Sequence, residues 1–297
     1  MDERVEILQT IAAETDDVAI WRELDAFYDL HNKPSERIEA LSKIIEDRDA
    51  HIEEFNELAK LLAAQGDRER ALAVSLRALR AYSDAIDLDM AEFHIALALA
   101  LERRDLAYEA VDTWNNKFKT QAETRALANA LDANAPDLAL HLIEQSAAYD
   151  AGDADLRLAA LRLRAASGDP IGSLDRLMAW RAEGGLPREG YGQIVGLGIN
   201  LGRDDQILEA LMTIPLDSLA LDAQLAAVEL ATRRRNDALL QAWRLEAGPQ
   251  WRGLPPLTAA RIAVALGERA SGEELATRAL DEAANDVEQA NAAQMLT

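Results

Sequence analysis

Short turn-forming segments recur along this 297-residue chain at a nearly constant spacing. Each contains Gly, Asn, Asp or Ser and lies between stretches that favour helix. The eight turn centres are Asn32, Gly66, Asp105, Asn134, Gly168, Gly202, Asn236 and Ser271. They step by 34, 39, 29, 34, 34, 34 and 35 residues. A period of about 34 residues predicts stacked helix pairs, each too small to bury its own apolar face.

The two steps that flank Asp105 are unequal, but together they span two ordinary repeats. Either Asp105 is not the true turn centre, or one helix pair has borrowed a half-turn from the next. Because the later turns return to register, the period carries more weight than any single turn.

Composition favours helix along the whole chain. The sequence is 49% apolar and only 5% aromatic. Alanine, leucine, arginine and glutamate dominate, whereas β-branched residues are sparse. Strict alternation of apolar and polar residues over strand lengths is hard to find. We therefore predict an all-α fold without a sheet.

The turns also predict where the helices begin. The first helices of the eight pairs, called helices A, are expected to begin near Val18, Ile52, Met90, Ala122, Ala154, Arg188, Leu219 and Leu257. The second helices, called helices B, are expected to begin near Pro34, Asp67, Asp105, Pro136, Pro170, Arg203, Asn236 and Gly272. A further helix over Glu3 to Glu14 has no partner before it. It resembles an orphaned second helix, so we expect the chain to be cut from a longer protein, with Met1 an added start residue.

Small and large apolar residues recur at positions typical of one repeat family. Its first-helix pattern, Trp-x2-Leu-Gly-x2-Tyr, is matched by Trp21, Leu24 and Tyr28, with Asp25 in place of the glycine. The next pair has the packing residues Phe55, Leu58, Ala59, Leu62, Ala71 and Ala78 around the turn at Gly66. The chain thus resembles the tetratricopeptide repeat (TPR) family. This resemblance implies one right-handed α-solenoid of about eight helix pairs over residues 1–297, acting as a scaffold for protein partners.

In the TPR family, helices A line the concave groove that binds partners. Carried over position by position, this rule predicts the groove residues Arg22, Glu23, Glu53, Asn56, Glu57, Lys60, Glu92, Arg125, Arg162, Gln193 and Arg233. The earlier members are mostly acidic and the later members more basic. We therefore expect a partner with mixed or positive charge to contact the early repeats.

Catalytic and metal-binding patterns are missing from the sequence. The four histidines, His31, His51, His94 and His141, fall in separate repeats without His-Glu-x-x-His spacing, and a polar histidine at a helix end is the commoner situation. The chain has no cysteine for thiolate catalysis or a zinc site. Acid pairs such as Glu53 with Glu57 are not distinctive in so acidic a chain. We predict no enzymatic activity, no cofactor and no bound metal.

The glycines between residues 190 and 198 resemble a glycine-rich loop. No strand precedes them and no Lys-Ser/Thr follows, so a phosphate site is not indicated. Gly196 falls within one residue of the small position of helix A. Close helix packing is therefore the expected reason for this cluster, with Gly196 as its contact point.

The charge balance limits the choice of partners. Lys and Arg total 31 against 53 Asp and Glu, a formal net charge of −22. Such a surface repels phosphate backbones, so nucleic acid is excluded as an expected partner. Solubility of a long exposed array is one explanation for the charge, and a basic protein segment or cationic polymer is the other. No apolar stretch approaches the ~20 residues needed to span a bilayer, so no membrane insertion is expected from this segment.

The tryptophans and the longest loops are interpreted from their positions in the repeat. Trp21, Trp114, Trp180 and Trp243 recur at core positions and are expected to be buried. Trp251 does not fall at a core position of the repeat. Two interpretations are therefore kept for it, burial in the core and an exposed aromatic contact. The Gly- and Pro-rich loops 184–187 and 248–256 are candidate hinges, with ordinary loops between repeats as the alternative.

Long, divergent and acidic TPR arrays of this kind resemble the periplasmic region of Pel-type bacterial exopolysaccharide outer-membrane export proteins. This resemblance implies a periplasmic location and recruitment of a polysaccharide-modifying enzyme, such as a deacetylase or hydrolase. It also implies guidance of a cationic, partly deacetylated polymer during biofilm formation. The alternative is a cytoplasmic TPR adaptor for a peptide or protein. Lys60 and Asn56 stand beside Glu53 and Glu57, which breaks the Lys and Asn cluster that a carboxylate-clamp adaptor needs.

Overall fold

The computed structural model of the chain describes residues 3–15, 17–115, 120–146, 149, 152–283 and 286–296. These residues form 18 α-helices and one short 3-10 helix, and none of them lies in a strand. The prediction of an all-α array of about eight helix pairs is confirmed. Each predicted helix begins within three residues of its observed start.

The chain divides into two compact units, which we describe separately. The N-terminal unit is Met1–Leu156 and the C-terminal unit is Arg157–Thr297. The boundary falls inside α11 (Ala154–Ala166). The two candidate hinge loops, 184–187 and 248–256, both lie within the C-terminal unit. Their role as hinges, and the single-domain organisation, stay predictions.

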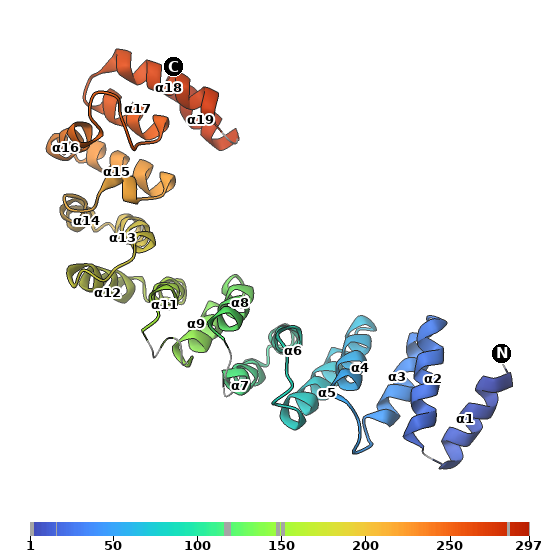
Figure 1. The fold of residues 1–297 in the computed structure, drawn as a ribbon. Coiled ribbons are helices and arrows are strands. Elements are labelled where there is room, and N and C mark those ends of the chain that lie inside the picture. The colour runs from blue at the N-terminus through green and yellow to red at the C-terminus, as the bar shows by residue number, and fades with distance from the viewer. Residues whose placement is uncertain are drawn as a thin grey trace. The chain divides into compact units, whose positions relative to one another are not determined.

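The N-terminal unit begins with α1 (Glu3–Thr15) and continues with four helix pairs in chain order (Figure 1). The pairs are α2 (Val18–Leu30) with α3 (Pro34–Ile44), α4 (Ile52–Ala64) with α5 (Arg68–Ala81), α6 (Leu88–Ala100) with α7 (Arg104–Asn115), and α8 (Gln121–Asp132) with α9 (Pro136–Glu144). The two helices of each pair pack together, and α1 packs on α2. Neighbouring pairs are also in contact. Helix α3 contacts α4, α5 contacts both α6 and α7, α6 contacts α8, and α7 contacts α9.

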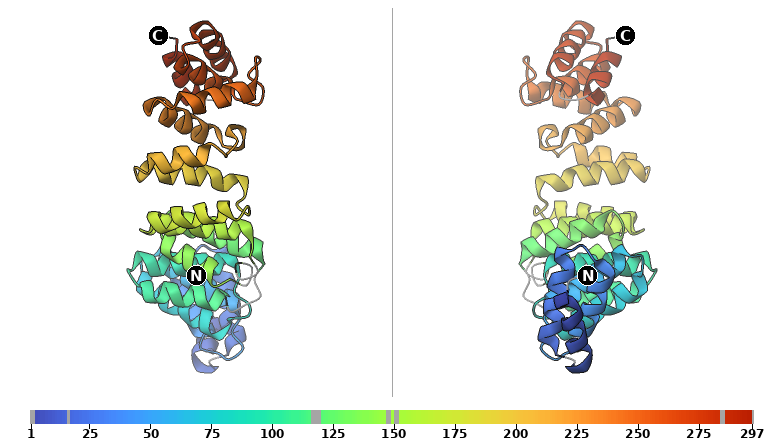
Figure 2. Two further views of the ribbon diagram at one scale, coloured as in Figure 1. Left: turned by 90° about the vertical axis from the view of Figure 1, so that its left-hand side faces the viewer. Right: turned by 90° about the vertical axis from the view of Figure 1, so that its right-hand side faces the viewer.

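The C-terminal unit repeats the same construction, as its helices show in Figure 2. After α11 come α12 (Pro170–Ala182), α13 (Arg188–Asn200) with α14 (Asp204–Leu211), α15 (Leu221–Arg233) with α16 (Asp237–Ala247), and α17 (Pro256–Ala265) with α18 (Arg269–Glu282). The 3-10 helix η1 (Leu216–Ser218) precedes α15, and α19 (Asp286–Gln294) packs on α18. Helices A of neighbouring pairs touch, α13 with α15 and α15 with α17.

Local chemistry explains where the helices begin and end. Asp17 and Asp87 accept N-cap hydrogen bonds from backbone N–H groups of the first turns of α2 and α6. Proline occupies the first position of α3, α9 and α12, where its missing N–H has no partner to lose. The turns at Asn32 and Gly66 have positive φ, as expected for the end of a helix.

Two predicted turn centres are wrong. The residue with positive φ before α7 is Glu102, and Asp105 lies in the first turn of α7. The turn before α18 is formed by Gly267, and Ser271 lies inside that helix. Aspartate and serine favour both turns and first helical turns, so they marked the start of helix B and not the turn itself. The apparent irregularity around Asp105 comes from this displacement.

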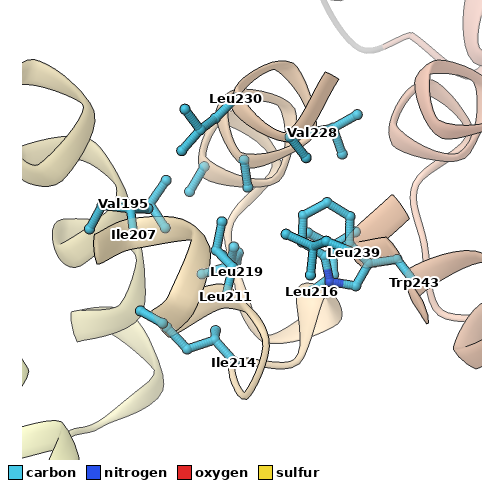
Figure 3. Packing of buried hydrophobic residues seen from close by; sticks show 14 of the residues in the cluster. Val195, Ile207, Leu211, Ile214, Leu216, Leu219, Val228, Leu230, Leu239 and Trp243 are labelled. Carbon is cyan, nitrogen blue, oxygen red and sulfur yellow. The ribbon is translucent and has the colours of Figure 1, made fainter. Parts of the chain in front are cut away.

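A continuous apolar core joins the repeats of the C-terminal unit. Figure 3 shows Val195 of α13, Ile207 of α14, Val228 of α15 and Trp243 of α16 within one cluster. The cluster extends from α11 to α17, with side chains from each pair packing on the next. Burial of this shared core stabilises helices that could not cover their apolar faces alone.

The tryptophans mainly follow the prediction. Trp114, Trp180 and Trp243 are buried, and Trp21 is half-buried against the core of the first repeat. Trp251 is buried as well, with the Arg244 guanidinium 4.2 Å from its ring centroid. The exposed alternative for Trp251 is therefore wrong, because the loop after α16 turns back and packs this ring into the core.

The glycines of α13 pack differently from the prediction. Gly196 is exposed, and a methyl group there would meet no atom within 4 Å. Gly198 lies directly against the side chain of Ile207 on α14, and Gly190 lies against Leu186. The close packing is real, but Gly198 and Gly190 provide it in place of Gly196. Gly196 lies on the opposite side of α13 from Gly198. The prediction located the small position of helix A only to within one residue, so it could not tell these two glycines apart.

Candidate partner-binding surfaces

The helices A of the N-terminal unit carry most of the predicted groove residues. Within this unit, α2, α4, α6 and α8 form one row and their helices B form another (Figure 1). On α4, Glu53, Glu57 and Lys60 are exposed and Asn56 is half-buried. Spacings of three and four residues place these side chains on one face of the helix. Glu92 of α6 is half-buried at the corresponding position.

Arg22, another predicted groove residue, binds groups within the chain. Its Nε donates to Glu54 Oε1 at 2.6 Å, and one Nη donates to the Asp49 carbonyl at 2.9 Å. Burial opposes ionisation of Glu54, but hydrogen bonds from Arg22 and from the His51 N–H outweigh it and lower the pKa of Glu54. The hydrogen bond to Glu54 raises the pKa of Arg22. Arg22 therefore joins the first helix pair to the second.

Two other basic groove candidates also bind a neighbouring repeat. Arg125 of α8 donates to Asp155 of α11 at 2.9 Å. Arg233 of α15 donates to the buried Asp204 of α14 at 3.0 Å. Glu23 lies 3.5 Å from Arg4, and both side chains are exposed. Arginine at these positions thus has a structural partner before any ligand binds.

Such contacts recur at about one repeat of sequence separation, between 24 and 34 residues. They include Arg22 with Glu54, Arg80 with Glu109, Arg104 with Asp137, His141 with Asp112, Arg125 with Asp155, Arg233 with Asp204, Arg244 with Glu268 and Thr258 with Gln224. Two of them, Arg22 with Glu54 and Arg80 with Glu109, are forked Arg–carboxylate pairs, a geometry that fixes orientation as well as distance. They hold neighbouring helix pairs in register alongside the apolar core.

The two units differ sharply in charge. Residues 1–156 contain 34 Asp or Glu and 16 Lys or Arg, whereas residues 157–297 contain 19 and 15. Most of the excess acid therefore belongs to the N-terminal unit. Since its arginines are largely engaged with neighbouring carboxylates, the exposed face of α4 presents Glu53 and Glu57 with Lys60 as the one cation of that group. This face suits a cationic partner.

The C-terminal unit contains a hollow between α15, α17 and α19. Its volume is about 540 Å³, within the range of ligand sites. The lining residues are Val228, Glu229, Thr232, Arg233, Arg261, Val264, Ala265, Gln294 and Met295. Of the predicted groove residues, only Arg233 lies there. Arg162 is exposed on α11, and Gln193 is half-buried on α13.

Arg261 and Val264 were missed by the sequence reasoning. Both lie on α17, which was correctly predicted as the last helix A. The groove rule was not applied to this helix, and it was the signal that could have pointed to Arg261. The contribution of α19 had no comparable signal, because its packing against α18 depends on the path of the chain beyond the repeats.

The described residues contain no group of three or more His, Asp or Glu side chains arranged to hold a metal ion. A search of the same residues finds no helix with the length and hydropathy of a membrane span.

The histidines are distributed as single side chains. His31 and His51 flank α2 and α4, and His141 Nε2 lies 2.7 Å from Asp112. His94, by contrast, is fully buried within α6, so a helix-end position is wrong for it.

Comparison with known proteins finds similar solved structures, but no family model and no curated protein matches the chain. The structure of Naa15/Naa10 bound to HypK-THB is similar over 94% of this chain and 44% of that chain, with 14% identity and a TM-score of 0.43. The chain thus spans less than half of that relative. A TPR protein from Parabacteroides merdae matches with 13% identity and a TM-score of 0.35. The C-terminal part of a TPR repeat-containing protein from Cytophaga hutchinsonii matches with 12% identity and a TM-score of 0.42. Each of these two comparisons covers 93% of this chain and 99% of the other.

The TPR-like description of this chain rests on its own geometry. The chain has a repeat of about 34 residues, two helices in each repeat, and, within each unit, packing of neighbouring pairs on one another.

Proposed function

We propose that the chain is a non-catalytic scaffold whose N-terminal unit binds a protein partner through a basic surface on that partner. The observation that supports this is the excess of 34 acidic over 16 basic residues in residues 1–156. Exposed Glu53 and Glu57 on one face of α4 give that charge a specific location. Complementary charge of this kind increases the rate of association and orients the partner.

Within this role, we propose that the chain acts in bacterial exopolysaccharide export. It recruits a periplasmic polysaccharide-modifying enzyme, a deacetylase or a hydrolase, and guides a cationic polymer as part of a longer outer-membrane protein. The acidic N-terminal unit supports a partner of this charge, since partly deacetylated amino sugars are cationic. The alternative is a cytoplasmic TPR adaptor for a peptide or protein, which would use the same acidic face.

Affinity purification from the native host, with the whole chain as bait, tests the role. Recovery of a polysaccharide deacetylase or hydrolase is expected for export. Recovery of chaperones or sensor kinases would favour the adaptor and contradict the export role.

A charge-reversal variant tests the acidic face. Replacing Glu53→Lys and Glu57→Lys together should weaken binding of the recovered partner by about tenfold or more at low salt. The matched control is Glu39→Lys, an exposed acid on helix B of the preceding pair. Equal affinities of the two variants, measured by calorimetry, would show that α4 is not the binding face.

The polymer is tested separately. Cationic amino-sugar oligomers should bind the chain with an affinity that falls as salt rises, whereas neutral acetylated oligomers should not. Absence of salt-sensitive binding to the cationic oligomers would remove the polymer from the proposal while leaving the protein partner in place.

A further inference from the structure

The hollow of the C-terminal unit combines an apolar lining with two arginines. Val228 of α15, Val264 and Ala265 of α17, and Met295 beside α19 supply the apolar side chains. Val264 is 46% exposed although it is a branched apolar residue on a helix that packs against three others. An exposed apolar surface with a polar rim is typical of a binding site.

Basic side chains outnumber acidic side chains around the hollow. Of the residues that line the hollow, Arg233 and Arg261 are basic and only Glu229 is acidic. Arg261 is half-buried and makes no hydrogen bond or ion pair with another described residue. Arg233 uses one Nη for Asp204, which leaves other N–H groups of its guanidinium to donate. The local excess of positive charge is opposite in sign to the N-terminal unit and favours an acidic ligand.

The neighbouring helix α19 indicates the shape of ligand that this face accepts. Ala292 of α19 is fully buried in a cluster with Leu257 of α17 and Ala279 of α18, and Met295 packs against the same cluster. The row of helices therefore already binds one short helix through small apolar contacts. The hollow lies beside it, with α15 and α17 on one side and the end of α19 on the other.

We infer that this hollow docks an acidic amphipathic helix of a partner protein. Its apolar residues insert between Val264 and Met295, and its Asp or Glu side chains accept hydrogen bonds from Arg261 and Arg233. This is helix-in-groove recognition with charge-assisted hydrogen bonds at the rim. The inference goes beyond the acidic face of the N-terminal unit and involves a ligand of the opposite charge.

The test uses the full chain and fluorescein-labelled synthetic helices with amidated C-termini. One probe has Leu at spacings of three and four with Glu on its flanks, a second has Lys in place of each Glu, and a third scrambles the Leu positions. Fluorescence polarisation should show binding of the first probe, with at least tenfold weaker binding of the other two. No binding of the acidic probe, or equal binding of the scrambled probe, would overturn the inference.

Variants locate the site. Arg261→Glu and Val264→Asp should each weaken binding of the acidic probe by tenfold or more, and Arg261→Glu should strengthen binding of the Lys probe. The matched controls are Arg278→Glu on α18 and Ile171→Asp on α12. Arg278 pairs with Glu282, and Ile171 is 50% exposed outside the hollow. Circular dichroism checks that each variant is folded.

Two results would place the site elsewhere. One is unchanged binding in a folded Arg261→Glu chain, and the other is equal loss in the control variants. Glu53→Lys with Glu57→Lys should leave binding of the acidic probe unchanged, so failure of the proposed function and failure of this inference are distinguishable.

Discussion

At the scale of single residues, burial decides how His94 behaves. His94 is completely enclosed in the N-terminal unit, and its Nδ1 lies 3.0 Å from Ser75 Oγ on α5. Its Nε2 is buried without a hydrogen-bond partner among the described residues. Burial is the main cause that lowers the pKa of His94 to about 4, with the nearby Arg80 acting in the same direction and Glu109 against it. The folded chain therefore requires a neutral imidazole.

This requirement predicts a pH-dependent stability. The unfolded chain takes up a proton at His94 near the ordinary pKa of 6.5, whereas the folded chain does so only near pKa 4. The contribution of neutral His94 to the free energy of unfolding is therefore fully present above pH 6.5. It falls by about 1.4 kcal/mol per pH unit as pH decreases toward 4. Urea unfolding of the wild type and of His94→Leu between pH 4.5 and 7 measures the difference, because the carboxylates are common to both.

Parallel pH dependence of the two proteins would contradict this account. NMR titration provides an independent check, since the His94 ring should stay neutral in the folded protein through pH 5, whereas an accessible histidine would be mostly protonated there.

At the scale of helices, most of the fold was predictable because capping, turn chemistry and apolar spacing are local. The start of α13 at Arg188 and the start of α4 at Ile52 follow directly from the sequence.

The candidate partner-binding residues were less predictable. Arg22, Arg125 and Arg233 were predicted to face a groove, and each binds a carboxylate about one repeat away. Spacing along one helix cannot show which way a long side chain turns, since its partner belongs to another helix.

Two glycines of α13 that are separated by one residue provide a prediction at the scale of the helix. Gly198→Ala should destabilise the C-terminal unit by roughly 1–3 kcal/mol, because the new methyl group would overlap the fully buried Ile207. Gly196→Ala should instead stabilise it by up to about 1 kcal/mol, because alanine favours helix and nothing is in contact there. Thermal unfolding of the two variants measures these opposite shifts, and a shift of the same sign in both would be inconsistent with the packing of α13 on α14.

At the scale of the whole molecule, stability is built from contacts between neighbouring repeats. Within each unit, neighbouring helix pairs touch, and the polar contacts between pairs span about one repeat. In such an array, the effect of a substitution should decline with distance along the chain. Separate compact units reinforce this expectation, since each has its own core.

Hydrogen exchange tests this locality. In Gly198→Ala, backbone amides of α13, α14 and the adjoining α15 should exchange faster, because local unfolding becomes more favourable there. Amides of α4 and α5 in the N-terminal unit should keep their wild-type rates. Mass spectrometry of peptic fragments resolves these segments. A uniform rise in exchange along the chain would indicate a single cooperative structure.

The amino-acid sequence alone determined the all-α class, the repeat length and the beginnings of the helices. These properties depend on interactions within a few residues, such as a cap, a positive-φ glycine or a helical apolar stripe. Tertiary structure decided that Trp251 is buried, that Gly198 and not Gly196 allows close packing, and that Arg22, Arg125 and Arg233 bind neighbouring repeats. It also formed the hollow that contains Arg261, because α15, α17 and α19 meet only in the folded chain. Each of these outcomes depends on which side chains come into contact across helices, and that information is absent from any one helix.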